Sequence, residues 1–175
     1  MLSETWEHQY RRMHRQYELL QRTADQNKYD EIQQADRARD ILYHFCCDAF
    51  HLRDWITNAD QTLKDARKAA LNAFLPKNDQ NPRALALAKC ADIANGFKHG
   101  GLDQGFYTPG GPAEIVEHVQ GVTFPKTFPA NFSANHWKIR AIVSGVEDDA
   151  LDVARDAVAE WDWWLPNNGL WVPSL

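Results

Sequence analysis

Apolar side chains recur at steps of three and four residues along most of the chain, which is the spacing of amphipathic α-helices. A first stripe predicts a helix over residues 3–24, with Ser3 as its N-cap. The apolar positions of that stripe are Trp6, Tyr10, Met13, Tyr17 and Leu20. A longer stripe runs over residues 28–73. Because a single helix of that length is unusual, we predict a break near residues 58–60.

A helix over residues 82–99 is indicated by the signals at its two ends. Asn81 precedes Pro82, which is a typical helix start, and two glycines at 100 and 101 are a typical stop. The segment between them is rich in alanine and carries an apolar stripe of helical period. We expect this helix to pack against the segment 44–56.

Strand-like alternation is confined to the stretch before the last helix. Five glycines and two prolines make residues 100–113 a loop, and residues 114–124 are compatible with one or two short strands. In residues 137–143 the apolar positions alternate with polar ones, as in a half-buried strand. Ser144 and Glu147 then match a capping box for a last helix over 147–165, which Pro166 ends.

These patterns predict one mainly α domain over residues 1–175. We expect a helical bundle of four or five helices, with a small antiparallel β element inserted at about 114–144 before the C-terminal helix.

Composition narrows the class of protein. A formal net charge of -5 over 175 residues does not indicate a broad basic surface for nucleic acid. The three cysteines, Cys46, Cys47 and Cys90, form no Cys-x-x-Cys pair, which argues against a disulfide framework and a thiolate zinc site. The polar N-terminus does not resemble a signal peptide, and no apolar run is long enough to span a membrane. We therefore expect a cytoplasmic protein without a membrane partner.

The first candidate site lies on the second predicted helix. His44, Asp48, His51 and Trp55 follow one another at steps of 4, 3 and 4, so they share one edge of the apolar face. Two imidazoles and a carboxylate in such a row can bind a metal ion or share a proton. The alternative is that these side chains flank the core and bond to neighbouring helices, which is the more common role of such residues.

The second candidate site lies near the end of the helix over 82–99. Asp92, Asn95 and His99 fall on one side of it, and Lys98 stands beside His99. A histidine in the last turn of a helix is favoured in its charged form. We predict that these side chains form one hydrogen-bonded cluster with His51 or Asp54 of the facing helix. The alternative is a purely structural interface between two helices.

Tryptophans and alanines suggest an assembly. Four tryptophans, Trp161, Trp163, Trp164 and Trp171, stand close together near the end of the sequence. We expect Trp161 and Trp164, three residues apart on a helix, to seal the core, and Trp163 or Trp171 to reach a neighbouring subunit. The prediction is a homodimer that uses these tryptophans or the alanine-rich face of the helix over 82–99.

Motifs for cofactors are missing from the sequence. The glycines fit no nucleotide-binding fingerprint, and neither a Gly-x-Ser-x-Gly elbow nor a His-Glu-x-x-His motif occurs. We therefore expect no cofactor.

Two segments carry a resemblance to a known family. FHLRDWI, at 50–56, and ADIANGFKHG, at 91–100, resemble a group of bacterial proteins with a His-Leu-x-Asp-Trp segment followed by Asp-x-x-Asn-x-x-Lys-His. The layout over residues 30–100 is similar to the HEPN superfamily. The resemblance implies an all-helical bundle, often dimeric, of the kind found in toxin–antitoxin and phage-defence systems.

Many HEPN proteins are metal-independent ribonucleases whose motif is an arginine, four to six residues and a histidine. His99 matches the histidine, whereas the arginine would stand at one of three positions that hold Asp92, Ile93 and Ala94. The motif is therefore incomplete, and Arg53 of the facing helix is the substitute cation that we consider.

Three function hypotheses follow from the sequence. The first is a HEPN-like protein that binds RNA or a protein partner. The second is a ribonuclease that uses His99 with Arg53 or Lys98. The third is a metal-dependent enzyme that uses His44, Asp48 and His51.

Overall fold

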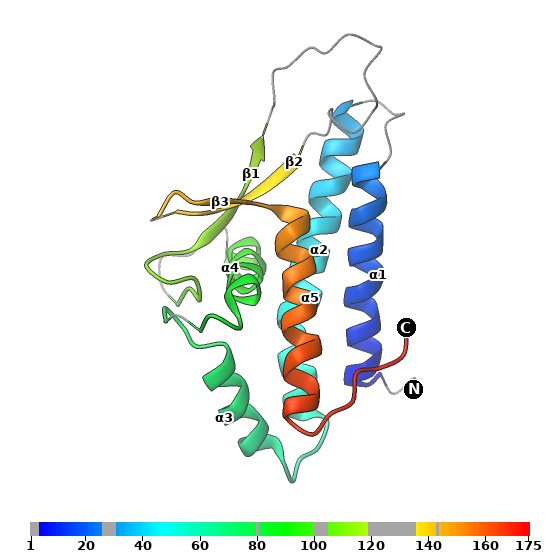
Figure 1. Ribbon diagram of the computed structural model, residues 1–175, viewed down its shortest axis with the longest axis vertical. Coiled ribbons are helices and arrows are strands. Elements are labelled where there is room, and N and C mark those ends of the chain that lie inside the picture. Colours follow the sequence, from blue (N-terminus) through cyan, green and yellow to red (C-terminus); the bar gives the residue numbers. More distant parts are fainter. Residues whose placement is uncertain (1–3, 26–30, 80, 100–104, 119–135, 143) are drawn as a thin grey trace.

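The computed structural model describes residues 4–25, 31–79, 81–99, 105–118, 136–142 and 144–175. For some of these it describes the backbone alone, without the side chains: residues 23–25, 31–35, 97–99, 117–118 and 136. Within these ranges the chain forms five helices and three strands (Figure 1). The helices are α1 (Trp6–Asp25), α2 (Glu31–Asn58), α3 (Lys64–Phe74), α4 (Leu85–His99) and α5 (Ala150–Asn167). The strands are β1 (Ala113–His118), β2 (His136–Ala141) and β3 (Glu147–Asp149).

The predicted class, a mainly α bundle with a small antiparallel β element before the last helix, is confirmed. The break that we expected near residues 58–60 separates α2 from α3. In the part of the chain that the structure describes, no helix combines the length and the apolarity needed to cross a membrane.

Three long helices form one side of the molecule. Figure 1 shows α1, α2 and α5 running side by side, and each of them contacts the other two. Two hydrogen bonds fix α5 to its neighbours: the Tyr10 hydroxyl of α1 donates to Asp162 at 2.6 Å, and the buried indole N–H of Trp161 donates to the Ala49 carbonyl of α2 at 3.0 Å. Trp161 and Trp164 are buried, so the prediction that both seal the core is confirmed.

Helix α4 lies at the centre of the fold and is buried on nearly all sides. It contacts α2, α5 and β1, so its expected packing against residues 44–56 is confirmed. Its alanines face these neighbours and not solvent: Ala84, at the turn before the helix, is buried, as are Ala86, Ala88, Ala91 and Ala94. Small side chains let neighbouring helices approach closely. The prediction that this face forms a dimer interface is therefore wrong, because the protomer itself covers the face.

The sheet is antiparallel, in the order β1-β2-β3. Ile139, at the centre of β2, is fully buried and stands opposite Ile115 of β1. On the other face Arg140 lies between Glu114 and Glu147, its partners on the flanking strands, and forms ion pairs with both. Residues 119–135 and Val143, parts of the segments expected to be strands, lie outside the described ranges.

The start of the last helix differs from the prediction. Residues 147–149 pair with β2 as strand β3, and the helix begins at Ala150 with Asp149 as its N-cap. Asp149 accepts a hydrogen bond from the Leu151 N–H at 2.9 Å. The capping box of Ser144 and Glu147 is therefore wrong, because strand pairing extends the backbone at Glu147. Pro166 lies within the last turn of α5, which ends one residue later.

Candidate functional site

Asp92 of α4 is fully buried and holds the loop that follows the helix. Its carboxylate accepts three backbone hydrogen bonds, from Tyr107 at 2.6 Å, Thr108 at 2.9 Å and Ala113 at 3.1 Å. Burial raises the pKa of Asp92, while these N–H donors act in the opposite direction. The carboxylate thus fixes the loop over 105–113 against α4.

Arg53 of α2 reaches the same loop from the other side. Its guanidinium donates to the Tyr107 hydroxyl at 2.8 Å and to the Asn72 side chain at 3.0 Å. It also lies over the rings of Phe50 and Tyr107, at 5.4 and 5.8 Å from their centres. Asp54 stands 3.7 Å from its third nitrogen. The donors of Arg53 therefore have partners within the fold, which leaves this cation poorly placed to hold a phosphate.

The structure describes only part of the predicted polar cluster. Asp92 and Arg53 are joined through Tyr107, whereas the described hydrogen bonds of Asp92 lead to the loop and not to His51 or Asp54, which are both exposed. Among the described residues no hydrogen bond joins Asp92 directly to His51 or Asp54, because loop amides satisfy the carboxylate. A connected cluster that includes His99 stays a prediction, since the side chain of His99 lies outside the described part of the structure. Asn95 is half-buried on α4.

Lys98 and His99 belong to the last turn of α4, but their side chains lie outside the described part of the structure. Their participation in a site stays a prediction.

The His44, Asp48 and His51 row does not form a metal centre. Burial raises the pKa of Asp48, against the opposite effects of the hydrogen bond from Gln9, of Arg12 and, last, of the two imidazoles. Asp48 accepts a hydrogen bond from the Gln9 side chain of α1 at 3.0 Å, while His44 and His51 are exposed. Among the described residues no three histidine, cysteine, aspartate or glutamate side chains gather closely enough to hold one ion. The row flanks the α1–α2 contact, which was the alternative interpretation.

The cysteines are packing residues. Cys46 and Cys90 are fully buried and Cys47 is half-buried. Burial raises the pKa of Cys46 and of Cys47, which disfavours the thiolate that a nucleophile needs.

A different site lies at the end of the bundle where α1 begins. A pocket of about 700 Å³ opens there, and we call it the tryptophan pocket. Residues 4–7, the end of α2, the turn after it, Arg67 of α3 and the tail at 170–171 line it. Three of the lining residues are tryptophans from three separate elements: Trp6, Trp55 and Trp171. The volume falls in the range typical of ligand pockets, about 300–1,000 Å³.

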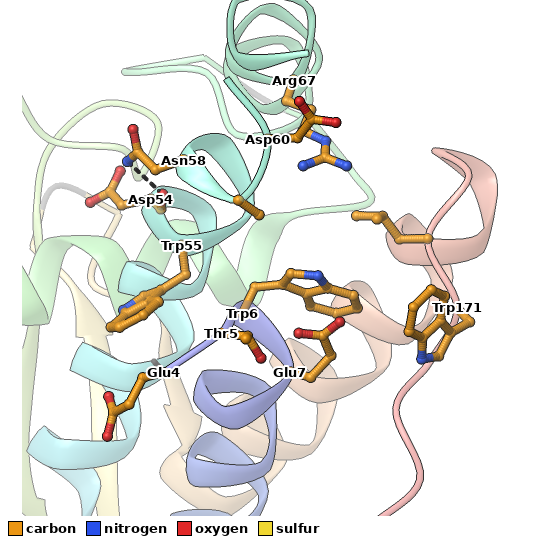
Figure 2. A pocket seen from close by; sticks show the side chains of 12 residues that line it. Glu4, Thr5, Trp6, Glu7, Asp54, Trp55, Asn58, Asp60, Arg67 and Trp171 are labelled. Atoms are coloured by element: carbon orange, nitrogen blue, oxygen red, sulfur yellow. Dashed lines mark hydrogen bonds between the residues drawn. The ribbon is translucent and has the colours of Figure 1, made fainter. Parts of the chain in front are cut away.

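The tryptophans differ in exposure. Trp6 is buried and Trp55 half-buried, but Trp171 is 66% exposed. The rings of Trp6 and Trp171 stand 6.1 Å apart at an angle of 60°. Figure 2 shows Trp6 and Glu7 on one side of the pocket, facing Trp171 of the tail, with Trp55 and Glu4 on the other side. Trp171 thus rests against α1 while much of its surface remains open.

The charges around the pocket are mainly negative. Four carboxylates line it, from Glu4, Glu7, Asp54 and Asp60, against the single guanidinium of Arg67. Arg67 donates to the carbonyl of Ile56 at 3.2 Å, which fixes α3 to the end of α2. Hydrogen bonds from Thr62 lower the pKa of Asp60, with a smaller contribution from Arg67. The pocket therefore combines indole surface with negative charge.

Sequence reasoning placed the site elsewhere and missed this pocket. The periodic pattern places Trp6 in a core stripe, and the sequence predicts that Trp163 or Trp171 reaches a neighbouring subunit. The signal that was present is Trp171 itself, a large aromatic residue that follows the end of the last predicted helix. The sequence does not show that this tail returns to the start of α1.

We compared the chain with family models, with curated proteins and with solved structures, and none of them matches it.

Proposed function

We propose that the chain is a HEPN-like helical domain that binds a protein partner at the tryptophan pocket. The observation that carries the proposal is the pocket itself, which presents the exposed indole of Trp171 beside the other two tryptophans. Tryptophan is enriched among the residues that dominate binding energy in protein interfaces. An exposed aromatic side chain beside a pocket of this size therefore favours a binding role.

A protein partner fits the charges of the pocket better than RNA does. Four carboxylates against one guanidinium repel phosphates, and the formal net charge of the chain is -5. The ribonuclease hypothesis has less support, because Arg53 and Asp92 are both engaged in holding the loop over 105–113. RNA binding, or cleavage that depends on His99, is the outcome that would favour that alternative.

The test is a selection of random peptides on the purified chain, with a variant that fills the pocket. Ala59 lines the pocket and is exposed, so Ala59→Trp obstructs it without disturbing the core. Ala159→Trp, at an exposed position of α5 outside the pocket lining, is the matched control. We expect selected peptides to bind the wild type and the control equally, and the pocket variant at least about tenfold more weakly.

Two results would contradict the proposal. One is that no peptide is enriched, or that enriched peptides bind Ala59→Trp as well as the wild type. The other is cleavage of single-stranded RNA in the presence of a chelator that is lost in His99→Ala while the melting temperature is unchanged.

A further inference from the structure

We infer that the tryptophan pocket recognises a basic side chain, lysine or arginine, of the partner segment, held between the indole of Trp171 and the carboxylate of Glu7. This inference rests on the proposed function, because it names the chemistry of the group that enters the same pocket.

Glu7 is the carboxylate of the pocket that is left for a ligand. Glu4 forms an ion pair with Arg12 at 2.9 Å, and Asp54 lies 3.7 Å from Arg53. Asp60 is engaged by Thr62 at 2.6 and 2.8 Å. For Glu7, no ion pair or side-chain hydrogen bond occurs within the described ranges. A cation entering the pocket therefore gains a counter-ion that has no partner among the described residues.

Trp171 supplies the aromatic surface for that cation. Indole is the strongest of the side-chain rings in attracting a cation over its face. Trp6 is too deeply buried to offer its own face, but it supports Trp171 through the contact between their rings. The structure already contains two such pairs elsewhere: the Arg83 guanidinium lies 4.5 Å from the ring centre of Trp163, and the Arg39 guanidinium lies 5.6 Å from that of Trp137. The face of Trp171 has no such partner among the described cations.

The tail holds Trp171 in place before any ligand binds. On one side, the N–H of Leu170 donates to the Leu165 carbonyl at the end of α5, at 3.0 Å. On the other side, Arg11 of α1 donates to the Ser174 carbonyl at 2.9 Å. Leu170 and Pro173 are buried, so the backbone on both sides of the exposed indole is anchored. An aromatic surface fixed in this way binds with less loss of conformational entropy than a free tail would.

The positive charge of Arg67 lies next to Asp60 and away from Glu7. Its guanidinium donates to the Ile56 carbonyl, and Figure 2 shows it beside Asp60 at one end of the pocket, while Glu7 and Trp171 lie on either side of an opening at the other end. The cation is therefore expected at the end formed by α1 and the tail.

The test follows the indole N–H of Trp171 by NMR in the full chain. The probes are N-acetyl methylamides of lysine and arginine, with the norleucine analogue as a neutral control of similar length. We expect the two cations to shift the signal with a Kd in about the millimolar range, and norleucine to leave it in place. Glu7→Gln is expected to weaken binding of the cations about fivefold to tenfold, an effect that shrinks as salt is raised.

Glu18→Gln is the matched control, since Glu18 is exposed on the same helix and does not line the pocket. Trp171→Ala removes the reporting indole, so binding to this variant is followed at the indole N–H of Trp6, whose ring contacts Trp171. We expect the cations to leave that signal in place in Trp171→Ala. Because Trp171 is exposed, we expect the variant to keep its fold. The inference is overturned if norleucine binds as well as lysine, or if Glu7→Gln changes nothing. It is also overturned if pocket-dependent peptides carry no basic residue, and in that case the proposed function still stands. If no peptide depends on the pocket, the proposed function fails, while the titration still decides the cation site.

Discussion

Replacing Asp92 with asparagine tests whether this carboxylate is structural. The substitution keeps the size of the side chain but exchanges one acceptor oxygen for an N–H₂ donor. In the wild type one oxygen accepts from Tyr107, and the other accepts from both Thr108 and Ala113. The best orientation of asparagine keeps its oxygen toward the latter two, so the N–H of Tyr107 then faces another donor.

The expected loss of stability follows from these bonds. A buried polar group without a partner costs about 1–3 kcal/mol, and Asp92→Asn creates one at the Tyr107 N–H and a second at its own amide. The ionised wild-type carboxylate carries a desolvation penalty that asparagine lacks, which reduces the difference. We expect a net loss of about 2–4 kcal/mol, and a melting temperature lower by about 2–4 °C for each kcal/mol.

Urea unfolding and thermal melting, both followed by circular dichroism, measure this loss. Asp54→Asn is the control, because Asp54 is 63% exposed and its contact with Arg53 is long. It should stay within about 0.5 kcal/mol of the wild type. If Asp92→Asn unfolds at the same urea concentration as the control, the carboxylate does not anchor the loop. If it also removes RNA cleavage, Asp92 belongs to a catalytic site.

Two further predictions concern buried groups of the bundle. Glu160 of α5 accepts hydrogen bonds from two amides at the start of α4, at 2.9 and 2.8 Å. We therefore expect Glu160→Gln to lower the free energy of unfolding, measured in urea, by about 1–2 kcal/mol. The control Asp156→Asn, at an exposed position, should lower it by less than about 0.5 kcal/mol. Equal stability of these two variants would contradict the capping role. Burial lowers the pKa of His14, outweighing the opposite effects of Asp162 and Glu18. The unfolded chain therefore binds a proton at His14 more readily than the folded chain does. The free energy of unfolding accordingly decreases as the pH falls below about 6.5. The melting temperature of His14→Phe should accordingly fall less than that of the wild type between about pH 7 and about pH 5, and parallel curves would refute the reasoning.

Much of the helical part of the fold could be predicted because its signals are local. A repeat of three and four residues predicts a helix whatever packs against it, and the break after α2 followed from length alone. The start of α5 could not be predicted in this way. Ser144 and Glu147 match a local capping pattern, but pairing of Glu147 with Arg140 of β2 decides the conformation.

The candidate site was harder to predict than the fold. Periodicity placed Asp92 correctly on the polar side of a helix, but it does not show which backbone amides face that side. The first of those amides, that of Tyr107, lies 15 residues later in the sequence. The three tryptophans of the pocket come from elements that meet only in the folded chain. Contacts between elements that are far apart in the sequence do not produce a periodic pattern of residues.

The hydrogen bonds of α5 have a consequence for the time course of folding. Tyr10 and Asp162 are 152 residues apart, and Trp161 is 112 residues from the carbonyl that it binds. The amide of Ala86 at the start of α4 donates to Glu160, which is 74 residues further on in the sequence. During synthesis, α1, α2 and α4 therefore leave the ribosome with apolar faces that lack their last neighbour. Closure by α5 is a late and highly non-local step, and chains of this kind fold more slowly than bundles with local contacts. Until α5 is made, the nascent chain has to be kept from associating with others through these faces.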